Sequence, residues 1–418
     1  MSVLRQHLPV TLGAAALLSL SAVARAPSEL QIHAGKHDRR QTLVGVSVAG
    51  LPPGHYELRP LAAATSGAAG SSGAAGAASG ANAPIPIQID PAHRAWFVLP
   101  SLAAGQERTY VIHALPQPAS QAAAVVQEET DLRASINGRA VLTYIGGHGR
   151  LPSTDIKPAY QRGGYIHPVR TPSGRIATDD YPSDHYHQHG VMMAWTSVEY
   201  EGRKTDFWNM GNSLGRVEAI GVDHRQSGPV FAGWHADHHY VDLTSGTPAI
   251  ALRELWQVRV YALDGANVFD IDVRQEAPLN QKVSLPEYHY GGMAVRGAAS
   301  FRGNPANATV LTSDGKDRAG ADASRARWAY IGGQVDGAMA GIAMLGHPDN
   351  FRAPEPLRVH PTDPYICFAP SRLGAWSITT ATPHAVKYRF VVMDGPPDRA
   401  LLDRIWRDYA DPPTVTLK

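Results

Sequence analysis

The sequence predicts an all-β fold, in which a large antiparallel β-sandwich or super-sandwich follows a small N-terminal β domain and one helix ends the chain. Short segments rich in β-branched and aromatic residues recur along the 418 residues, and 40 glycines and 32 prolines supply turns between them. Several segments alternate polar and apolar residues, as half-buried antiparallel strands do. No fixed-period repeat is visible, so a propeller is disfavoured.

The first 26 residues are typical of a bacterial secretory signal. Arg5 precedes an apolar run from about Val10 to Ala24, and the small residues Ala22, Ala24 and Ala26 offer cleavage sites. The run is short for a membrane span, and no other segment is apolar enough to be one. We therefore expect an exported protein, periplasmic or extracellular, with no membrane span after signal cleavage.

The small β domain is expected over residues 27–116. Strand-like stretches such as LQIH, IPIQID and ERTYVIHAL surround residues 62–84, where Gly, Ala and Ser predominate. Glycine at this frequency argues against a helix, so we interpret residues 62–84 as a flexible surface insertion. Residues 117–124 are predicted to form a linker, and residues 125–418 the large domain.

The large domain shows closely spaced strand patterns, including AVLTYI, ELWQVRVYAL and KYRFVVMDG. The stretch VMMAWTSVEY, residues 191–200, predicts a single strand. Near the C-terminus, RALLDRIWRDYA predicts a helix, because Leu401, Leu402, Ile405 and Tyr409 fall on one face and a proline pair follows.

Charge and motif content narrow the classes of function. Positive and negative charges nearly cancel, at +1 with neutral histidines, and no segment forms a basic stripe, so nucleic acid is not expected as a partner. Cys367 is the one cysteine, so no disulfide can form within the chain. The sequence has no Gly-rich phosphate-binding loop and no H-E-x-x-H motif, which disfavours nucleotide-dependent enzymes and zincin proteases.

Polar and aromatic residues typical of active sites are concentrated in residues 164–211, which contain His167, Asp184, His185, His187, His189, Asp206 and Trp208. If the segment before the predicted strand is extended, its three alternate histidines share a face, with neighbours roughly 7 Å apart and the outer pair roughly 13 Å. Two neighbours could hold a metal, whereas all three could do so only in a bent segment. The alternative is that these side chains merely hydrogen-bond one another in a turn-rich loop.

A second candidate stretch is EYHYGGMAVRG. In a strand, Tyr288 and Tyr290 share one face and His289 takes the other, while Arg296 follows at a spacing that could return it to the same pocket. Tyrosine rings and an arginine suit a polyhydroxylated or anionic small molecule. The alternative is aromatic packing at a bulge.

Two further stretches are less specific. GWHADHHY alternates polar residues and places His239 beside other potential metal ligands, but a surface strand shares this pattern. GHPDNFRAPEPLRVHP is a loop held in a defined shape by its prolines, and it either lines a site or closes one end of the sandwich. Its candidate binding residues are His347, Asn350 and Arg352.

Together, these motifs resemble those of the bacterial PmoA-like family, labelled "methane oxygenase PmoA" and essentially a domain family of unknown function. The resemblance covers about residues 125–418. Many relatives have DHPHHRG at the central motif, so His185 and His187 carry over, whereas Gln188 replaces a histidine and His189 stands where they have arginine. The oxygenase label is not taken literally, because that enzyme is embedded in a bilayer. By analogy, the expected fold is similar to galactose-mutarotase super-sandwiches.

The sequence therefore predicts that the protein binds and processes a saccharide or related polyhydroxy compound, using histidines that exchange protons near neutral pH. The candidate catalytic residues are His185, His187, Asp184 and Asp206, where either aspartate would fix the histidine tautomers. The candidate substrate-binding residues are His167, Trp208, Tyr288, His289, Tyr290, Arg296, His347, Asn350 and Arg352. Trp208 is expected to offer a platform to a sugar face.

Two alternatives stay open. The first is an oxidoreductase that depends on copper or iron, in which case a divalent metal is the cofactor. Its candidate ligands are His185, His187, His189 and His239. The second alternative is a non-catalytic protein that binds a sugar in the same pocket without turnover.

Overall fold

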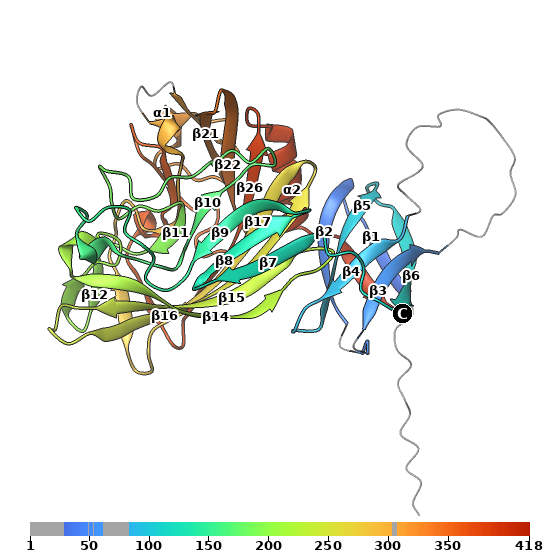
Figure 1. The fold of residues 1–418 in the computed structure, drawn as a ribbon, viewed down its shortest axis with the longest axis horizontal. Coiled ribbons are helices and arrows are strands. Elements are labelled where there is room, and N and C mark those ends of the chain that lie inside the picture. The colour runs from blue at the N-terminus through green and yellow to red at the C-terminus, as the bar shows by residue number, and fades with distance from the viewer. Residues whose placement is uncertain (1–28, 49, 53, 62–82, 303–306) are drawn as a thin grey trace, which may run out of the picture.

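The computed structural model describes residues 29–48, 50–52, 54–61, 83–302 and 307–418 (Figure 1). The expected signal segment, residues 1–26, and nearly all of the expected insertion, residues 62–84, lie outside them. The described part contains one seven-stranded, two eight-stranded and one four-stranded antiparallel sheet. The prediction of an all-β sandwich with a small N-terminal β domain and a C-terminal helix is confirmed.

The small domain is the seven-stranded sheet, with the strand order β2-β5-β4-β3-β6-β1-β27. Its strands are β1 Glu29–His33, β2 Arg39–Ser47, β3 His55–Pro60, β4 Ile85–Ile89, β5 Arg94–Leu102, β6 Glu107–Leu115 and β27 Thr414–Leu417. The last strand therefore pairs with the first, Leu417 opposite Leu30. The expected division gave residues 414–417 to the large domain, because the alternation TVTL fits the edge of any sheet.

The large domain is a sandwich of two eight-stranded sheets. The first has the order β23-β24-β19-β11-β10-β9-β8-β7, with β7 Ala123–Glu128, β8 Asp131–Ile136, β9 Arg139–Ile145, β10 Tyr165–Val169, β11 Val191–Ala194, β19 Gly292–Arg296, β23 Leu357–Val359 and β24 Tyr365–Phe368. The second has the order β14-β15-β16-β17-β26-β22-β21-β20, with β14 Gly215–Gln226, β15 Ala232–Asp242, β16 Ala249–Leu263, β17 Ala266–Glu276, β20 Ala308–Thr312, β21 Trp328–Val335, β22 Ala338–Gly346 and β26 His384–Asp394. Alternate residues of both sheets meet in one buried core that includes Ile166, Val295, Trp256 and Phe390.

A four-stranded sheet extends one end of the sandwich, with β12 Val198–Tyr200, β13 Arg203–Thr205, β18 Lys282–Leu285 and β25 Trp376–Thr379. The predicted single strand over residues 191–200 is wrong, because β11 ends at Ala194 and β12 begins at Val198. Ser197 between them has a φ of 53°, and this left-handed backbone cannot continue a strand. The chain therefore leaves the first sandwich sheet here and enters the smaller one.

The α-helices of the described chain are α1 Arg318–Ala321 and α2 Arg399–Ala410, and short 3-10 turns include Pro158–Tyr160, Met210–Asn212, Ala299–Phe301 and Pro370–Leu373. Helix α2 begins where the carboxylate of Asp398 accepts a hydrogen bond from the Leu401 amide. Its residues Leu402 and Ile405 are buried with the outer face of the second sandwich sheet and with Leu43 of the small domain. Helix α2 thus packs against both the small domain and the sandwich (Figure 1).

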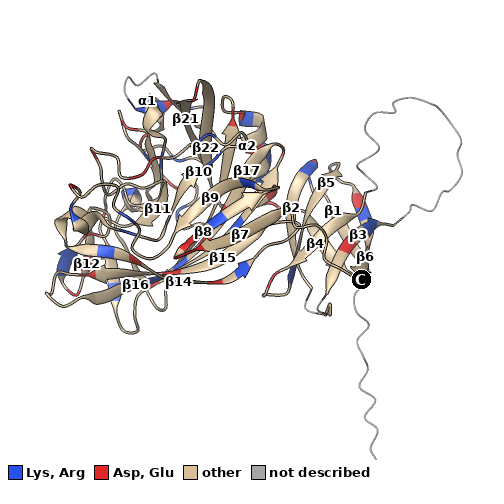
Figure 2. Cartoon of the chain, in the orientation of Figure 1, with Lys and Arg blue, Asp and Glu red and all other residues tan. Residues whose placement is uncertain are grey.

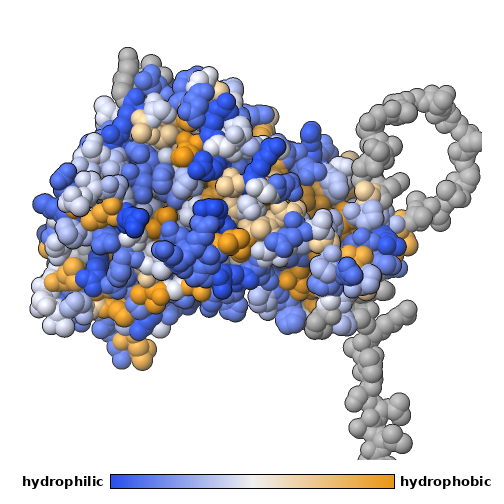
Figure 3. Space-filling model, viewed as in Figure 1, coloured by the Kyte–Doolittle hydropathy of each residue, from blue (hydrophilic) through white to orange (hydrophobic). Residues whose placement is uncertain are grey.

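Basic and acidic residues are interspersed over the strands and loops (Figure 2), and in the view of Figure 3 hydrophobic residues lie scattered among hydrophilic ones. Within the described ranges, no helix combines the length and the apolar composition needed to cross a membrane.

Candidate functional site

The candidate site lies on the outward face of the first sandwich sheet, where three chain segments meet. The Arg296 amide at the end of β19 donates to the carbonyl of Gly190, in the loop before β11, at 2.8 Å. Arg296 also stands opposite Tyr365 of β24, whose carbonyl accepts from the His360 amide at 3.0 Å. Because Val295 points into the sandwich core, the side chain of its neighbour Arg296 points outward.

Three imidazoles and two carboxylates gather at this junction. The ring centroids of His185 and His187 are 5.6 Å apart, and those of His185 and His360 are 5.8 Å apart. Nδ1 of His185 lies 3.4 Å from Oδ2 of Asp184 and 3.4 Å from Oδ2 of Asp363. Nδ1 of His360 lies 3.3 Å from the same Asp363 oxygen. We call these five residues the histidine cluster.

The loop that carries the histidines is not extended. The His185 amide donates to the Pro182 carbonyl and the Gln188 amide to the His185 carbonyl, both at 2.8 Å. These turns overturn the expectation that three alternate histidines share a face. His189 is fully buried, and its Nδ1 lies 2.6 Å from Oδ1 of Asp180.

The remaining metal candidate, His239, is also apart from the cluster. It lies on β15 in the second sandwich sheet, opposite Glu218 and Arg253. Of the four histidines considered as metal ligands, the structure therefore brings only His185 and His187 together.

Burial sets the electrostatics of the site. It lowers the pKa of His187 to about 3, with smaller contributions from His185, His189 and Arg296. Burial also lowers the pKa of His360 and of His167, whose Nδ1 is 3.0 Å from the hydroxyl of Thr178. These imidazoles are therefore neutral at pH 7, and each has one ring nitrogen that can accept a hydrogen bond.

Arg296 is the buried cation beside the cluster, with an exposed fraction of 0%. Its Nη1 donates to Oε1 of Gln188 at 2.7 Å and lies 4.0 Å from Oδ2 of Asp363. Its Nη2 is 3.6 Å from Oδ1 of Asp184, which also pairs with Arg302. Gln188 thus orients this arginine.

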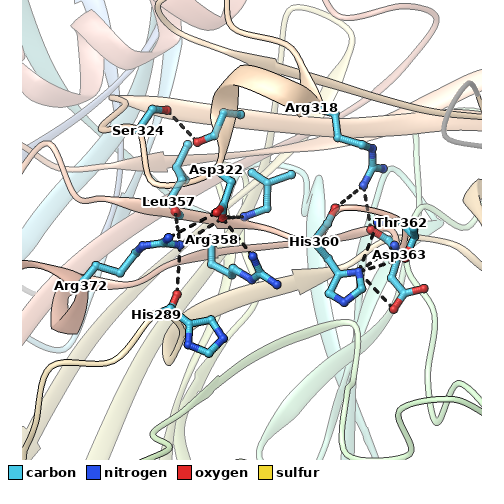
Figure 4. A network of polar contacts seen from close by, with 12 residues as sticks. His289, Arg318, Asp322, Ser324, Leu357, Arg358, His360, Thr362, Asp363 and Arg372 are labelled. Atoms are coloured by element: carbon cyan, nitrogen blue, oxygen red, sulfur yellow. Dashed lines mark hydrogen bonds and ion pairs between the residues drawn. The ribbon is translucent and has the colours of Figure 1, made fainter.

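A second polar group adjoins the cluster (Figure 4). Asp322 pairs with Arg358 at 3.3 Å and with Arg372 at 3.0 Å. Arg372 also donates to the carbonyl of His289 at 3.2 Å, and Figure 4 shows Arg358 between the rings of His289 and His360.

The tyrosines predicted to bind substrate flank this second group. Tyr288 and Tyr290 are half-buried, with ring centroids 5.1 Å apart. The His289 ring is exposed and lies 4.9 Å from that of Tyr290. No strand covers residues 286–291, so the expectation that His289 takes the face opposite the two tyrosines is wrong. The His289 ring also lies 4.6 Å from that of Tyr288, and the three rings form one aromatic group beside the polar residues.

Trp208 and Asp206 have structural surroundings instead of the expected roles. Trp208 is only 1% exposed and packs edge-on against Tyr290 and Tyr365, so it offers no open face. Asp206 accepts hydrogen bonds from the amides of Trp208 and Asn209 at 2.8 Å, which shape the turn after β13. These contacts give Asp206 a structural role in the turn, and among the described residues no imidazole hydrogen-bonds to it.

The three candidate binding residues of the proline-rich loop, His347, Asn350 and Arg352, are not part of the histidine cluster. Asn350 is buried, donates to Glu355 and to the Lys387 carbonyl, and accepts from the Lys387 amide. Arg352 donates to the carbonyls of Pro370 and Gly374. His347 instead lines a separate cleft of about 450 Å³ between the small domain and the second sandwich sheet.

Among the described residues, two groups have ligand atoms close enough to hold a metal ion. In His185, His360 and Asp363, the atoms lie within 4.8 Å of one another. Two imidazoles and a carboxylate suit several divalent metals. However, Nδ1 of His360 already accepts the Asp363 amide at 2.9 Å, so a metal would take its other ring nitrogen or displace that bond. The second group, Asp223, His224 and His235, is more exposed and lies near the inter-domain cleft.

The fold adds several residues to the site, of which Arg358 and His360 lie in the proline-rich stretch that the sequence singled out, whereas sequence reasoning missed Asp180, Arg302, Arg318 and Asp363. A local signal existed for His360 and Asp363, because the segment HPTDP places a histidine three residues before an aspartate. The sequence also contains GNSLG at residues 211–215, with the spacing of a nucleophile elbow. Ser213 follows a 3-10 turn and precedes β14, so it lacks the strand–turn–helix context that an elbow requires.

Comparison with known proteins adds the family but no activity. A search among curated proteins gave no match. Residues 131–407 match a family described as "Family of unknown function (DUF6807)", and nothing in that description refers to a methane oxygenase. The match spans most of the sandwich and includes the histidine cluster. The chain therefore belongs to the DUF6807 family of unknown function.

Proposed function

We propose that this protein binds a saccharide or related polyhydroxy compound at the histidine cluster and processes it by acid–base chemistry. The observation that carries the proposal is the convergence of His185, His360 and two carboxylates around Nδ1 of His185. That nitrogen is buried and has no hydrogen-bond partner among the described residues. Because two carboxylates flank Nδ1, this nitrogen is expected to carry the ring hydrogen, which leaves Nε2 to take a proton from a ligand hydroxyl. Asp184 and Asp363 would then stabilise the resulting imidazolium.

Aromatic and polar neighbours support a ligand of this class. The half-buried rings of Tyr288 and Tyr290 offer apolar area together with hydroxyl groups. Arg358 and His289 add donors at the edge of the cluster (Figure 4). Export is part of the same proposal and rests on the signal-like N-terminal sequence. N-terminal sequencing of the native protein is expected to begin near Arg25 or Pro27.

Replacing His185 with glutamine is expected to reduce turnover by about 10²–10⁴-fold, the usual contribution of a general acid or base. Thermal stability is expected to stay near that of the wild type, because Nδ1 makes no hydrogen bond whose loss would strand a buried partner. Isothermal titration and turnover assays against a panel of neutral and acidic sugars measure both effects.

The matched control is His113→Gln, which changes a half-exposed histidine on β6 of the small domain. It is expected to leave binding and turnover unchanged. Equal binding and turnover in the wild type and His185→Gln would refute the role of the cluster. Binding without any turnover in the wild type would identify a sugar-binding protein that is not an enzyme.

A metal-dependent enzyme is the second candidate, because His185, His360 and Asp363 form a group of suitable donor atoms. A bound divalent metal would supply Lewis-acid or redox chemistry at this position. Elemental analysis of protein purified without a histidine tag separates the two candidates. About one copper, iron or zinc per chain, lost in His360→Ala, would favour the metal enzyme, whereas trace metal in both proteins would favour acid–base chemistry alone.

A further inference from the structure

The buried side chain of Arg389 shows how the Nε–Nη2 edge of a guanidinium can be satisfied within this protein. Arg389, 4% exposed, uses Nε and Nη2 to donate to the two carboxylate oxygens of Asp270, at 2.8 and 2.9 Å. These two N–H groups are parallel, so this edge of a guanidinium matches a planar oxyanion. In the Arg389–Asp270 pair, the N–H groups of Nε and Nη2 thus each have a carboxylate oxygen as acceptor, and the arginines of the site can be compared with it.

The same edge is empty in Arg296. Its Nε and Nη2 are both buried and have no hydrogen-bond partner in the described chain. The Asp184 oxygen 3.6 Å from Nη2 is beyond hydrogen-bonding distance. Leaving a buried donor unsatisfied costs about 1–3 kcal/mol, and more for a charged group. The Nε and Nη2 groups of Arg296 can therefore donate hydrogen bonds to an acceptor supplied by a ligand.

Arg318, which contacts the backbone of Asp363, repeats the pattern. Its Nη1 donates to the carbonyls of His360 and Asp363, at 2.6 and 3.0 Å, so the side chain is held in place (Figure 4). Its Nε and Nη2 are buried without a partner among the residues described. Arg302 has a free buried Nε as well, while its Nη2 pairs with Asp184.

The nearby carboxylates do not fill these edges. The Asp184 side chain is 40% exposed and lies on the turn-rich loop. It can therefore move away when a ligand binds, or bind the arginines together with that ligand. Asp179 lies near Arg296 and Arg302, but burial raises its pKa, and among the described residues its carboxylate accepts a hydrogen bond only from the Asp180 amide. The free donors are flat pairs, which suit a carboxylate or phosphate better than single water molecules.

We propose that the ligand of the histidine cluster is a saccharide or polyhydroxy compound that carries a carboxylate, and that the free edges of Arg296 and Arg318 receive this oxyanion. The inference rests on the proposed function and names its substrate class as acidic sugars. Arg302 acts as a positioning residue, because it shares Asp184 with Arg296.

The test is isothermal titration of the full mature chain with galacturonate, with galactose and with inorganic phosphate. Galacturonate is expected to bind at least about tenfold more tightly than galactose, as one charge-assisted contact contributes about that factor. Arg302→Gln changes a partly exposed residue, so folding is expected to survive, and this variant is expected to lose most of the preference. Arg133→Gln, an exposed arginine paired with Glu128, is the control and is expected to keep it.

The outcomes separate this inference from the proposed function. Equal affinity for galacturonate and galactose would overturn the inference and uphold a neutral-sugar site. Binding of phosphate that is lost in Arg302→Gln, with no binding of either sugar, would uphold the oxyanion site and contradict the proposed function. A preference for galacturonate that survives in both Arg302→Gln and Arg296→Lys, with thermal melts confirming folded protein, would also overturn the inference.

Discussion

Replacing Glu254 with glutamine is expected to lower the free energy of unfolding by about 3–5 kcal/mol. Glu254 is 2% exposed and lies on β16 between the two sandwich sheets. Its carboxylate pairs with Nδ1 of His238 at 2.6 Å and accepts from the Tyr240 hydroxyl at 3.0 Å and the Gln275 amide at 2.6 Å. Its charge also favours the protonated form of Arg162, a fully buried guanidinium. The glutamine variant leaves that cation without its counter-charge.

Glu218→Gln is the matched control for this effect. Glu218 lies on β14 of the same sheet and pairs with Arg216 at 2.6 Å, but both side chains are partly exposed. A surface pair of this kind contributes about 0–1 kcal/mol. Urea unfolding monitored by tryptophan fluorescence gives both free energies. Similar losses in the two variants would show that the interior network contributes no more than a surface ion pair.

The fold class could be predicted because it depends on local properties of the chain. Alternation of polar and apolar residues marks a strand wherever that strand ends up. The helix near the C-terminus was equally visible, since Leu402 and Ile405 follow the helical period and Asp398 precedes them as a cap. Long-range pairing is not local, so nothing in residues 414–417 showed that they join the N-terminal sheet.

The site was predictable only in part for the same reason. The density of histidines drew attention to His185 and His187, whose rings lie 5.6 Å apart in the structure. A period-two argument assumes an extended backbone, however, and the turns around Gln188 remove that assumption. His360 and Asp363 reach the cluster because β11, β19 and β24 are neighbours in one sheet. Such neighbours can be inferred only once the strand order is known.

Burial also separates candidates that look alike in the sequence. His189 has the same spacing as His185 and His187, yet it stacks on Tyr165 at 4.3 Å and meets the edge of Tyr181 at 4.6 Å. Its place is a packed and hydrogen-bonded interior. A histidine in a strand-edge loop therefore cannot be assigned to a site without knowing which side of the sheet the loop covers.

Glu355 offers a second strong test, because it is a carboxyl group buried away from any cation. It is 2% exposed and accepts hydrogen bonds from the Asn350 amide at 3.0 Å and the Tyr388 hydroxyl at 2.7 Å. Burial raises its pKa from 4.5 to about 7, and the two hydrogen bonds offset only part of that shift. The proton is therefore held more tightly in the folded chain than in the unfolded one.

The sign of the resulting pH dependence follows from this difference. Between pH 4.5 and about 7 the native state binds a proton that the unfolded state has released, so stability falls as the pH rises through this window. From pH 5 to pH 8, Glu355 is expected to contribute a loss of about 2–3 kcal/mol. Other groups titrate in the same range, so a comparison of two proteins is needed. The unfolding free energy is measured at pH 5 and at pH 8 for the wild type and for Glu355→Gln. The change between the two pH values in the variant is then subtracted from that in the wild type.

Glu287→Gln, which removes an exposed carboxyl group, is the control. Its change in unfolding free energy between pH 5 and pH 8 is expected to match that of the wild type. Glutamine at position 355 keeps one carbonyl to accept a hydrogen bond but cannot ionise, so only the pH-dependent part of the stability should disappear. An identical pH dependence in the wild type and Glu355→Gln would mean that Glu355 ionises near its ordinary pKa. In that case, water or a relaxed side chain solvates the carboxylate despite its buried position beside Tyr388.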